Sequence, residues 1–256
     1  MWKGYRQRFV PWIMLNLSKR ARRIVNPGND KIIEDKRVLA TLLNLLPHLY
    51  NKHSNVGPCV ASKNMEVMFS VLGFSVTCGP SGLPGGGKGV FLAEGSVERG
   101  TVICFYPGTI YKFMEPIFFP SLGNKFVFRC LDRLHIDGND RGLSKIIYKS
   151  CVGRDSAWPY EAADTTWLTG AAVVPWNIGQ YVNNQTTGSD ANVAYQELNI
   201  SLRDVPPALH CFLPNIWYSG GAEGSLRLIA LVSTRNISKG EEVLSNYYTL
   251  VADTKS

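Results

Sequence analysis

The sequence "GLPGGGKGVF", residues 82–91, decides the fold because it has two competing interpretations. Gly82, Gly87 and Lys88 have nearly the spacing of a phosphate-binding P-loop, which needs a hydroxyl directly after its lysine to hold Mg²⁺. Gly89 stands at that position instead, and the letters VFLA that follow are typical of a strand rather than of a helix. The stretch therefore predicts a glycine turn that opens a strand.

Positive charge is concentrated at the N-terminus. Residues 1–29 carry seven basic and no acidic side chains, whereas the remaining residues carry 20 of each sign. A nucleic-acid-binding domain usually spreads its basic excess over a folded face, so we do not expect direct binding to nucleic acid. The leader fits a mitochondrial transit peptide, its SKRARR cluster fits a nuclear signal, and a solvated arm is the third interpretation. We expect an intracellular protein, in the mitochondrion or the nucleus.

The sequence predicts neither a membrane span nor a metal site. The longest apolar run, near Phe9 to Leu17, falls short of the roughly 18 residues that a spanning helix needs. The six cysteines are at least 19 residues apart, so no Cys-x-x-Cys pair can chelate zinc, and the four histidines also lack paired spacing. We expect the cysteines to be buried small apolar residues and the protein to be a monomer.

The hydrophobic pattern changes near Gly73. Before it, apolar residues recur at helical spacing over 30–54, with Asp30 as a candidate cap, and again over 63–72. After it, short β-branched and aromatic runs alternate with glycine and proline, which predicts a strand-rich body. The expected organisation is a basic leader or arm (1–29), a helical N-terminal extension (30–79), a strand-rich domain (80–249) with an insert at about 139–176, and a C-terminal tail (250–256).

Four sequence blocks in the strand-rich domain carry a family resemblance. The first, residues 87–108, contains Gly-x-Gly-Val-Phe, then Arg-Gly, then a strand ending in Tyr-x-Gly. RLHIDG (133–138), NIGQYVNNQTTGSDANVAY (177–195) and LRLIALVSTRNISKGEEVLSNYY (226–248) follow in the family's order. Together they resemble the SET domain of protein lysine methyltransferases. The resemblance implies a mainly β fold with some α-helix, in which small curved sheets accompany a pseudoknot-like threading of the C-terminal segment.

The resemblance also implies an activity, the transfer of a methyl group from S-adenosylmethionine to a lysine side chain of a protein or peptide. In such a reaction a neutral amine attacks the methyl carbon in line, so the enzyme mainly aligns two ligands and keeps the amine uncharged. Catalytic roles fall to Tyr247 and Tyr106, whose phenols orient the amine and line its channel, and Tyr248 competes for the position of Tyr247. The resemblance assigns cofactor contacts to Gly87, Lys88, Gly89, Val90, Asn183, Asn184 and Tyr247.

Several positions depart from the family pattern. Asn184 replaces a histidine, residues 186–190 lengthen the loop after it, and Ser245 replaces a larger aromatic residue, which leaves room for more than one methyl. No cysteine follows Cys211, so the three cysteines that close the lysine channel in many members are missing, and the aromatic segment 212–221 either closes that wall or anchors a surface loop.

Other interpretations therefore stay open. One is a catalytically degenerate SET domain that binds a cofactor or partner without turnover, and another is a mitochondrial methyltransferase acting on a small molecule or a nonhistone protein. Each assigned site also has a purely structural alternative. The glycines can form a plain hairpin turn, the asparagines can cap a turn, and the tyrosines can be core aromatics.

Overall fold

A computed structural model gives the structure of most of the chain, namely residues 31–54, 59–170, 172–186, 188–220 and 224–246. It also gives the backbone of two short strands, β1 (Arg23–Val25) and β14 (Thr249–Val251), which pair in parallel. The rest of the predicted leader, the rest of the predicted tail and the predicted catalytic Tyr247 lie outside the described residues.

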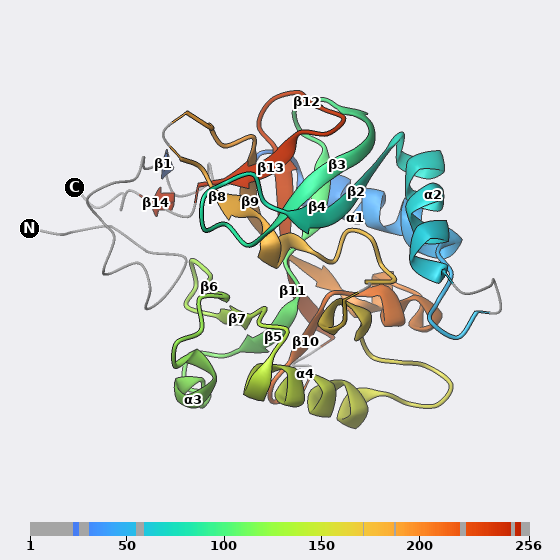
Figure 1. Cartoon of the computed structure of the whole chain (residues 1–256). Coiled ribbons are helices and arrows are strands. Elements are labelled where there is room, and N and C mark those ends of the chain that lie inside the picture. Colours follow the sequence, from blue (N-terminus) through green and yellow to red (C-terminus); the bar gives the residue numbers. More distant parts are fainter. Residues whose placement is uncertain are drawn as a thin grey trace, which may run out of the picture.

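Helices lie beside both sheets of the fold (Figure 1). α1 (Asp35–Leu45) and α2 (Val60–Leu72) precede the first long strand, as predicted for the helical extension. α3 (Phe118–Ser121) is a single turn, and α4 (Gly142–Asp155) lies in the predicted insert and packs against the smaller sheet. No helix among the described residues is long and apolar enough to cross a membrane. Short 3₁₀ helices occur at Leu46–His48, Thr166–Leu168, Gly179–Tyr181, Leu202–Asp204 and Pro207–Phe212.

The first helix is shorter than the predicted range of 30–54. It begins after Glu34 rather than at Asp30, because the backbone amides of Ile32 and Ile33 donate to the Gln196 side-chain oxygen, at 2.9 and 3.2 Å. It ends before Pro47, which has no amide hydrogen and cannot continue an α-helix. A 3₁₀ helix follows at Leu46–His48, and the other described residues of the predicted range, 31–34 and 49–54, are irregular chain.

The larger sheet has eight strands in the order β12-β3-β13-β9-β11-β4, with β2 beside β3 and β8 beside β13. β2 lies inside the range 30–79, so strand pairing begins before the expected start of the strand-rich domain at 80. The strands are β2 (Phe74–Pro80), β3 (Lys88–Val97), β4 (Val102–Phe105), β8 (Asn183–Asn184), β9 (Val193–Ser201), β11 (Ser225–Ser233), β12 (Ile237–Ser238) and β13 (Glu242–Ser245).

The smaller sheet has four strands in the order β10-β5-β7-β6. β5 pairs in parallel with β10 and antiparallel with β7, which also pairs antiparallel with β6. Its strands are β5 (Gly108–Tyr111), β6 (Val127–Arg129), β7 (His135–Asp137) and β10 (Asn215–Trp217).

The C-terminal strand β13 is bonded to β8 and β9, the two strands that flank an earlier loop. It pairs antiparallel with β3 and parallel with β8 and β9 (Figure 1). The Gln185 amide donates to the Ser245 carbonyl at 2.8 Å, and the Asn192 amide donates to the Leu244 carbonyl at 2.9 Å, so both ends of the β8–β9 loop are bonded to β13. This is the pseudoknot-like threading that the sequence predicted, an exception to the usual avoidance of threaded chains.

Two hydrophobic clusters divide the interior. The main cluster joins α1 and α2, through Val38, Leu42 and Met68, to the strands of the larger sheet. A smaller cluster around Tyr148 and Trp167 packs α4 against the later part of the insert and against Ile216 of β10, so the insert has a small core beside the main one. Among the cysteines, Cys104, Cys130 and Cys151 are buried as predicted, Cys78 and Cys211 are partly buried, and the prediction is wrong for Cys59, which is exposed.

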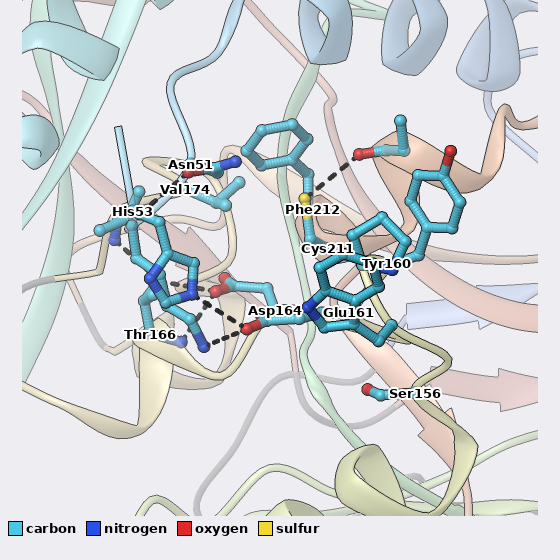
Figure 2. Close-up of a pocket in the computed structure, with 15 residues that line it drawn as sticks. Asn51, His53, Ser156, Tyr160, Glu161, Asp164, Thr166, Val174, Cys211 and Phe212 are labelled. Carbon is cyan, nitrogen blue, oxygen red and sulfur yellow. Dashed lines mark hydrogen bonds and ion pairs between the residues drawn. The ribbon is translucent and has the colours of Figure 1, made fainter. Parts of the chain in front are cut away.

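Asp164 connects the insert to the body. One of its oxygens accepts from the amide and the hydroxyl of Thr166, at 2.8 and 2.7 Å, and the other accepts from the Asn177 amide at 2.9 Å. Together with Lys52 and Glu161, it lines a cavity of about 600 Å³ (Figure 2). Burial of Asp164 raises its pKa to about 6, although these hydrogen bonds act in the opposite direction.

The raised pKa of Asp164 predicts a pH-dependent stability. The folded-state pKa lies above the ordinary value of 3.8, so the contribution of Asp164 is fully present below about pH 4 and is lost as the pH rises through 6. Relative to Asp164→Asn, the free energy of unfolding of the natural protein should fall by about 3 kcal/mol between about pH 4 and pH 7. Urea denaturation of both proteins measures this difference. A difference independent of pH would contradict the prediction.

Candidate active site

The predicted glycine turn and the predicted asparagine pair line one cleft of about 460 Å³. The side chain of Asn183 donates to the carbonyl of Lys88, 95 residues earlier in the chain, at 2.9 Å. Two segments that are distant in sequence therefore converge at one place. Of the site residues predicted from the sequence, the cleft is lined by Gly87, Lys88, Tyr106, Asn183 and Asn184.

The other predicted residues are placed differently. Gly89 and Val90 are buried in β3 next to the cleft and do not line it. Tyr247 and its competitor Tyr248 lie outside the described residues, so their catalytic role stays a prediction. Ser245, two residues before Tyr247, is fully buried and donates to the hydroxyl of Tyr195 at 3.0 Å.

A carboxylate on β13 fixes the glycine turn. Glu242 accepts from the Ser81 hydroxyl at 2.7 Å and from the Gly82 amide at 3.0 Å. It also accepts from the Asn183 side chain at 3.2 Å, while the same amide nitrogen donates to the Lys88 carbonyl. One anionic side chain thus joins the C-terminal strand, the turn and the asparagine segment, and hydrogen bonds to a charged group are stronger than those between neutral groups.

The two glycines of the motif are required for different reasons. At Gly89 an added Cβ would lie 2.3 Å from a carboxylate oxygen of Glu242, so the missing side chain makes room for that carboxylate, and the cofactor contact assigned to Gly89 stays a prediction. At Gly87 φ is +65° and nothing lies within 4 Å of an added Cβ. Glycine adopts this left-handed conformation without strain, and its backbone is open to the cleft.

Charged and aromatic groups also line the cleft. The Lys88 ammonium lies 4.5 Å from the centroid of the Tyr181 ring. The Tyr181 hydroxyl donates to Asp140 at 2.7 Å, and burial together with this carboxylate raises the pKa of Tyr181, which stays neutral. Lys125 and Arg141 also line the cleft. The cleft lining therefore presents three cations and one carboxylate to a bound ligand.

Gln180 is a site residue that the sequence analysis did not single out. Its side chain lines the cleft and is 4% exposed. The amide lies near the Tyr181 hydroxyl, but neither its oxygen nor its nitrogen makes a hydrogen bond of good geometry within the described part of the chain. An unpaired buried polar group costs about 1–3 kcal/mol, which favours a ligand or water as its partner. The sequence could have pointed to Gln180 only through its position, because it lies three residues before Asn183 in the same block.

Tyr106 lies at the inner end of the cleft. It is almost fully buried, and its hydroxyl donates to the Phe126 carbonyl at 2.7 Å. Its ring contacts those of Phe128 and Tyr195, at centroid distances of 5.5 and 6.5 Å. Tyr106 therefore forms an aromatic wall, in keeping with the channel-lining role expected from the sequence.

None of the described residues of the aromatic segment, 212–220, lines this cleft. Trp217 belongs to β10, and its indole donates to the Ser225 carbonyl at 2.8 Å. Tyr218 stacks on Tyr111 with 4.9 Å between the ring centroids, and neither residue lines the cleft. Both side chains pack on the smaller sheet and so anchor this segment there, while closure of the lysine channel by the segment stays a prediction.

One cluster of potential metal ligands surrounds an arginine side chain, which pairs with its two carboxylates. Potential ligand atoms of Cys130, Asp132 and Glu197 lie within 4.8 Å of one another. The guanidinium of the buried Arg227 pairs with Asp132 at 2.5 Å and with Glu197 at 3.0 Å. The positive charge at this place therefore comes from the protein itself.

Comparison with solved structures gives low-scoring likenesses. An inhibitor-bound humanized mutant of the Chaetomium thermophilum Polycomb Repressive Complex 2 has a TM-score of 0.37 and 18% identity, covering 68% of this chain and 15% of that chain. The same complex in an autoinhibited conformation bound to S-adenosylmethionine has a TM-score of 0.36 and 16% identity, with the same coverage. These scores are too low to establish a shared fold by themselves.

Curated sequences show a much closer relationship, although no protein-family model matches the chain. SET domain-containing protein 9 of Homo sapiens is 42% identical over 98% of this chain and 96% of the relative. The protein of the same name from Pongo abelii is 41% identical over 90% of this chain and 97% of the relative. The chain therefore carries a SET domain and belongs to the SET domain-containing protein 9 family.

Proposed function

We propose that the protein is an S-adenosylmethionine-dependent methyltransferase whose acceptor is a lysine side chain of a protein. The observation that supports this most is the convergence of Gly87, Lys88, Asn183 and Tyr106 on one cleft. Membership of a SET-domain family is consistent with it. When bound, S-adenosylmethionine supplies a methyl group activated by a sulfonium.

The cleft fits the chemical groups of this cofactor. Lys88 and Arg141 can pair with a carboxylate, and Asp140 can pair with an ammonium group. The unpartnered amide of Gln180 offers both a donor and an acceptor. The open backbone at Gly87 lets a ligand approach the turn without meeting a side chain.

The acceptor amine must lose its proton before it can attack. Tyr106 and Phe126 give the cleft an aromatic wall, and an apolar surrounding disfavours the charged ammonium and so lowers the lysine pKa. A phenol hydroxyl can then accept from or donate to the amine and hold its lone pair in line with the methyl group. We assign this orienting role to Tyr247, as the family resemblance implies.

The catalytically degenerate alternative shares the cofactor cleft and differs only in methyl transfer. Incubation of the purified protein with tritiated S-adenosylmethionine and a protein extract separates the two hypotheses. Incorporation of label into protein lysine supports the enzyme. Cofactor binding with no label in any protein, peptide or small-molecule fraction supports the degenerate module instead.

The network around Glu242 predicts a loss of cofactor affinity in Glu242→Ala. Without the carboxylate, the turn loses its bonds to Ser81 and Gly82 and must be ordered during binding. We expect the dissociation constant for S-adenosylmethionine to rise about tenfold, equivalent to about 1.4 kcal/mol, or one or two hydrogen bonds. Isothermal titration calorimetry measures it. Glu94→Ala is the matched control, because Glu94 is an exposed acid paired only with Lys239. Equal affinity in both variants would contradict this role.

The catalytic assignment predicts that Tyr247→Phe abolishes lysine labelling and leaves the affinity for S-adenosylmethionine within about twofold, since only the orienting hydroxyl is removed. The tritium assay and calorimetry measure the two quantities. Tyr248→Phe is the control with the adjacent hydroxyl removed. Full labelling by Tyr247→Phe together with loss in Tyr248→Phe would transfer the role to Tyr248.

A further inference from the structure

Large apolar side chains are exposed together near the cleft rather than scattered. Of the eleven large hydrophobic side chains exposed in the described part of the chain, seven belong to residues 113–122 and 143–146. Monomeric proteins rarely leave such a concentration uncovered unless it binds something. We define the apolar surface by its six members on and next to α3 and at the start of α4: Met114, Phe118, Phe119, Leu122, Leu143 and Ile146.

Hydrogen bonds join the two segments that carry the apolar surface. The buried Asn124 side chain donates to the Pro120 carbonyl in α3, at 2.9 Å, and to the Ser144 hydroxyl in α4, at 3.4 Å. Figure 1 shows α3 beside the first turn of α4. Because Ser144 and Tyr148 face the interior, Leu143 and Ile146 lie on the opposite, solvent face of the same helix. The surface is therefore one fixed feature of the fold.

The apolar surface continues into the rim of the cleft. Lys125 and Phe126 line the cleft and follow Leu122 by a few residues, and Asp140 and Arg141 line it just before Leu143. A chain bound across the apolar surface would thus extend directly to the cleft. This continuity favours the protein that enters the cleft as the occupant.

Charge around the surface favours an acidic occupant. Lys125, Arg141 and Lys149 are exposed, and neither lysine makes an ion pair within the described residues. The nearby acids Glu115 and Asp140 keep their negative charge when they accept from the Lys112 amide and from Tyr181, but four basic side chains of the same region outnumber them: Lys112, Lys125, Arg141 and Lys149. The apolar surface therefore has a positively charged border.

The same charge disfavours two other occupants. A second copy related by a two-fold axis would place the basic border against itself. The chain's own residues 1–29 carry seven basic side chains and no acidic one, so they would also bring like charge to the border. Neither pairing is complementary.

We propose that the apolar surface is a docking site for the protein substrate, which binds there through an apolar segment flanked by acidic residues and separate from its target lysine. The methylation part of this proposal rests on the proposed function, whereas the binding part does not. Docking beside the cleft raises the local concentration of the target lysine and so gives selectivity beyond the few residues that enter the cleft.

The first test is binding, and it does not depend on catalysis. A displayed library of random 16-residue peptides is selected on the full chain, and enriched peptides are resynthesised with a fluorescent label. We expect apolar peptides with flanking Asp or Glu. Phe118→Ser/Phe119→Ser should weaken their binding at least tenfold, since these rings are 66% and 70% exposed. Leu122→Ser/Ile146→Ser is a second pair in case the first does not fold. Trp158→Ser, a 96% exposed aromatic outside the surface, is the control.

The second test is methylation. A selected peptide joined to a lysine-containing acceptor peptide should raise kcat/KM at least tenfold over the acceptor alone in the natural protein, but not in Phe118→Ser/Phe119→Ser. Cofactor affinity should be equal in both. Peptide binding without any labelling would leave the docking site standing and overturn only the proposed enzymatic function.

Three results would overturn the docking proposal. One is equal binding of the selected peptides to the natural protein and to Phe118→Ser/Phe119→Ser. Another is enrichment of basic peptides. The third is co-sedimentation with phosphatidylserine and phosphatidylcholine vesicles that disappears in the same variant while no acidic peptide is selected, which would assign the surface to a membrane.

Discussion

The Glu242 carboxylate joins the C-terminal strand, the glycine turn and the asparagine segment. It accepts hydrogen bonds from the glycine turn and from Asn183, and Asn183 in turn reaches the Lys88 carbonyl. Because Glu242 lies on β13, the hydrogen bonds between this carboxylate and the turn form only when the C-terminal strand is in place. The cleft is therefore a product of the completed fold rather than of its local motifs.

The threading of β13 explains why the few hydrogen bonds of Glu242 are sufficient to hold the glycine turn in place. The strand pairs with β3 on one side and with β8 and β9 on the other, and the loop between β8 and β9 is bonded to it at both ends. A strand held in this way has little freedom to move along its axis or to fray. Main-chain hydrogen bonds therefore fix the position of Glu242, and the hydrogen bonds of its carboxylate in turn fix the position of the turn.

The sequence predicted most of what local motifs determine and little of what depends on packing between segments. The strand-rich body, α2 and the meeting of Gly87 with Asn183 were predicted because each motif has a fixed order. α4 was missed because its inner face includes Ser144 and Cys151, which weakens the helical pattern. The packing role of Gly89 was missed because only the structure shows the Glu242 carboxylate in the space that a Cβ would take. Gln180 was missed because only its burial with an unpaired amide marks it as a site residue, and burial cannot be read from the residue type.

The cleft and the apolar surface beside it thus differ in how strongly the fold constrains their residues. The inner part of the cleft depends on the threaded strands, because a Cβ at Gly89 would displace the Glu242 carboxylate that bonds to the turn. The outer wall comes from α3, the start of α4 and the segments between them, where the insert has a separate small core. Side chains such as Phe118 and Ile146 are not needed to fill that core, since they point to solvent. Substitutions on this wall can therefore alter what binds beside the cleft while the turn and Asn183 keep their positions.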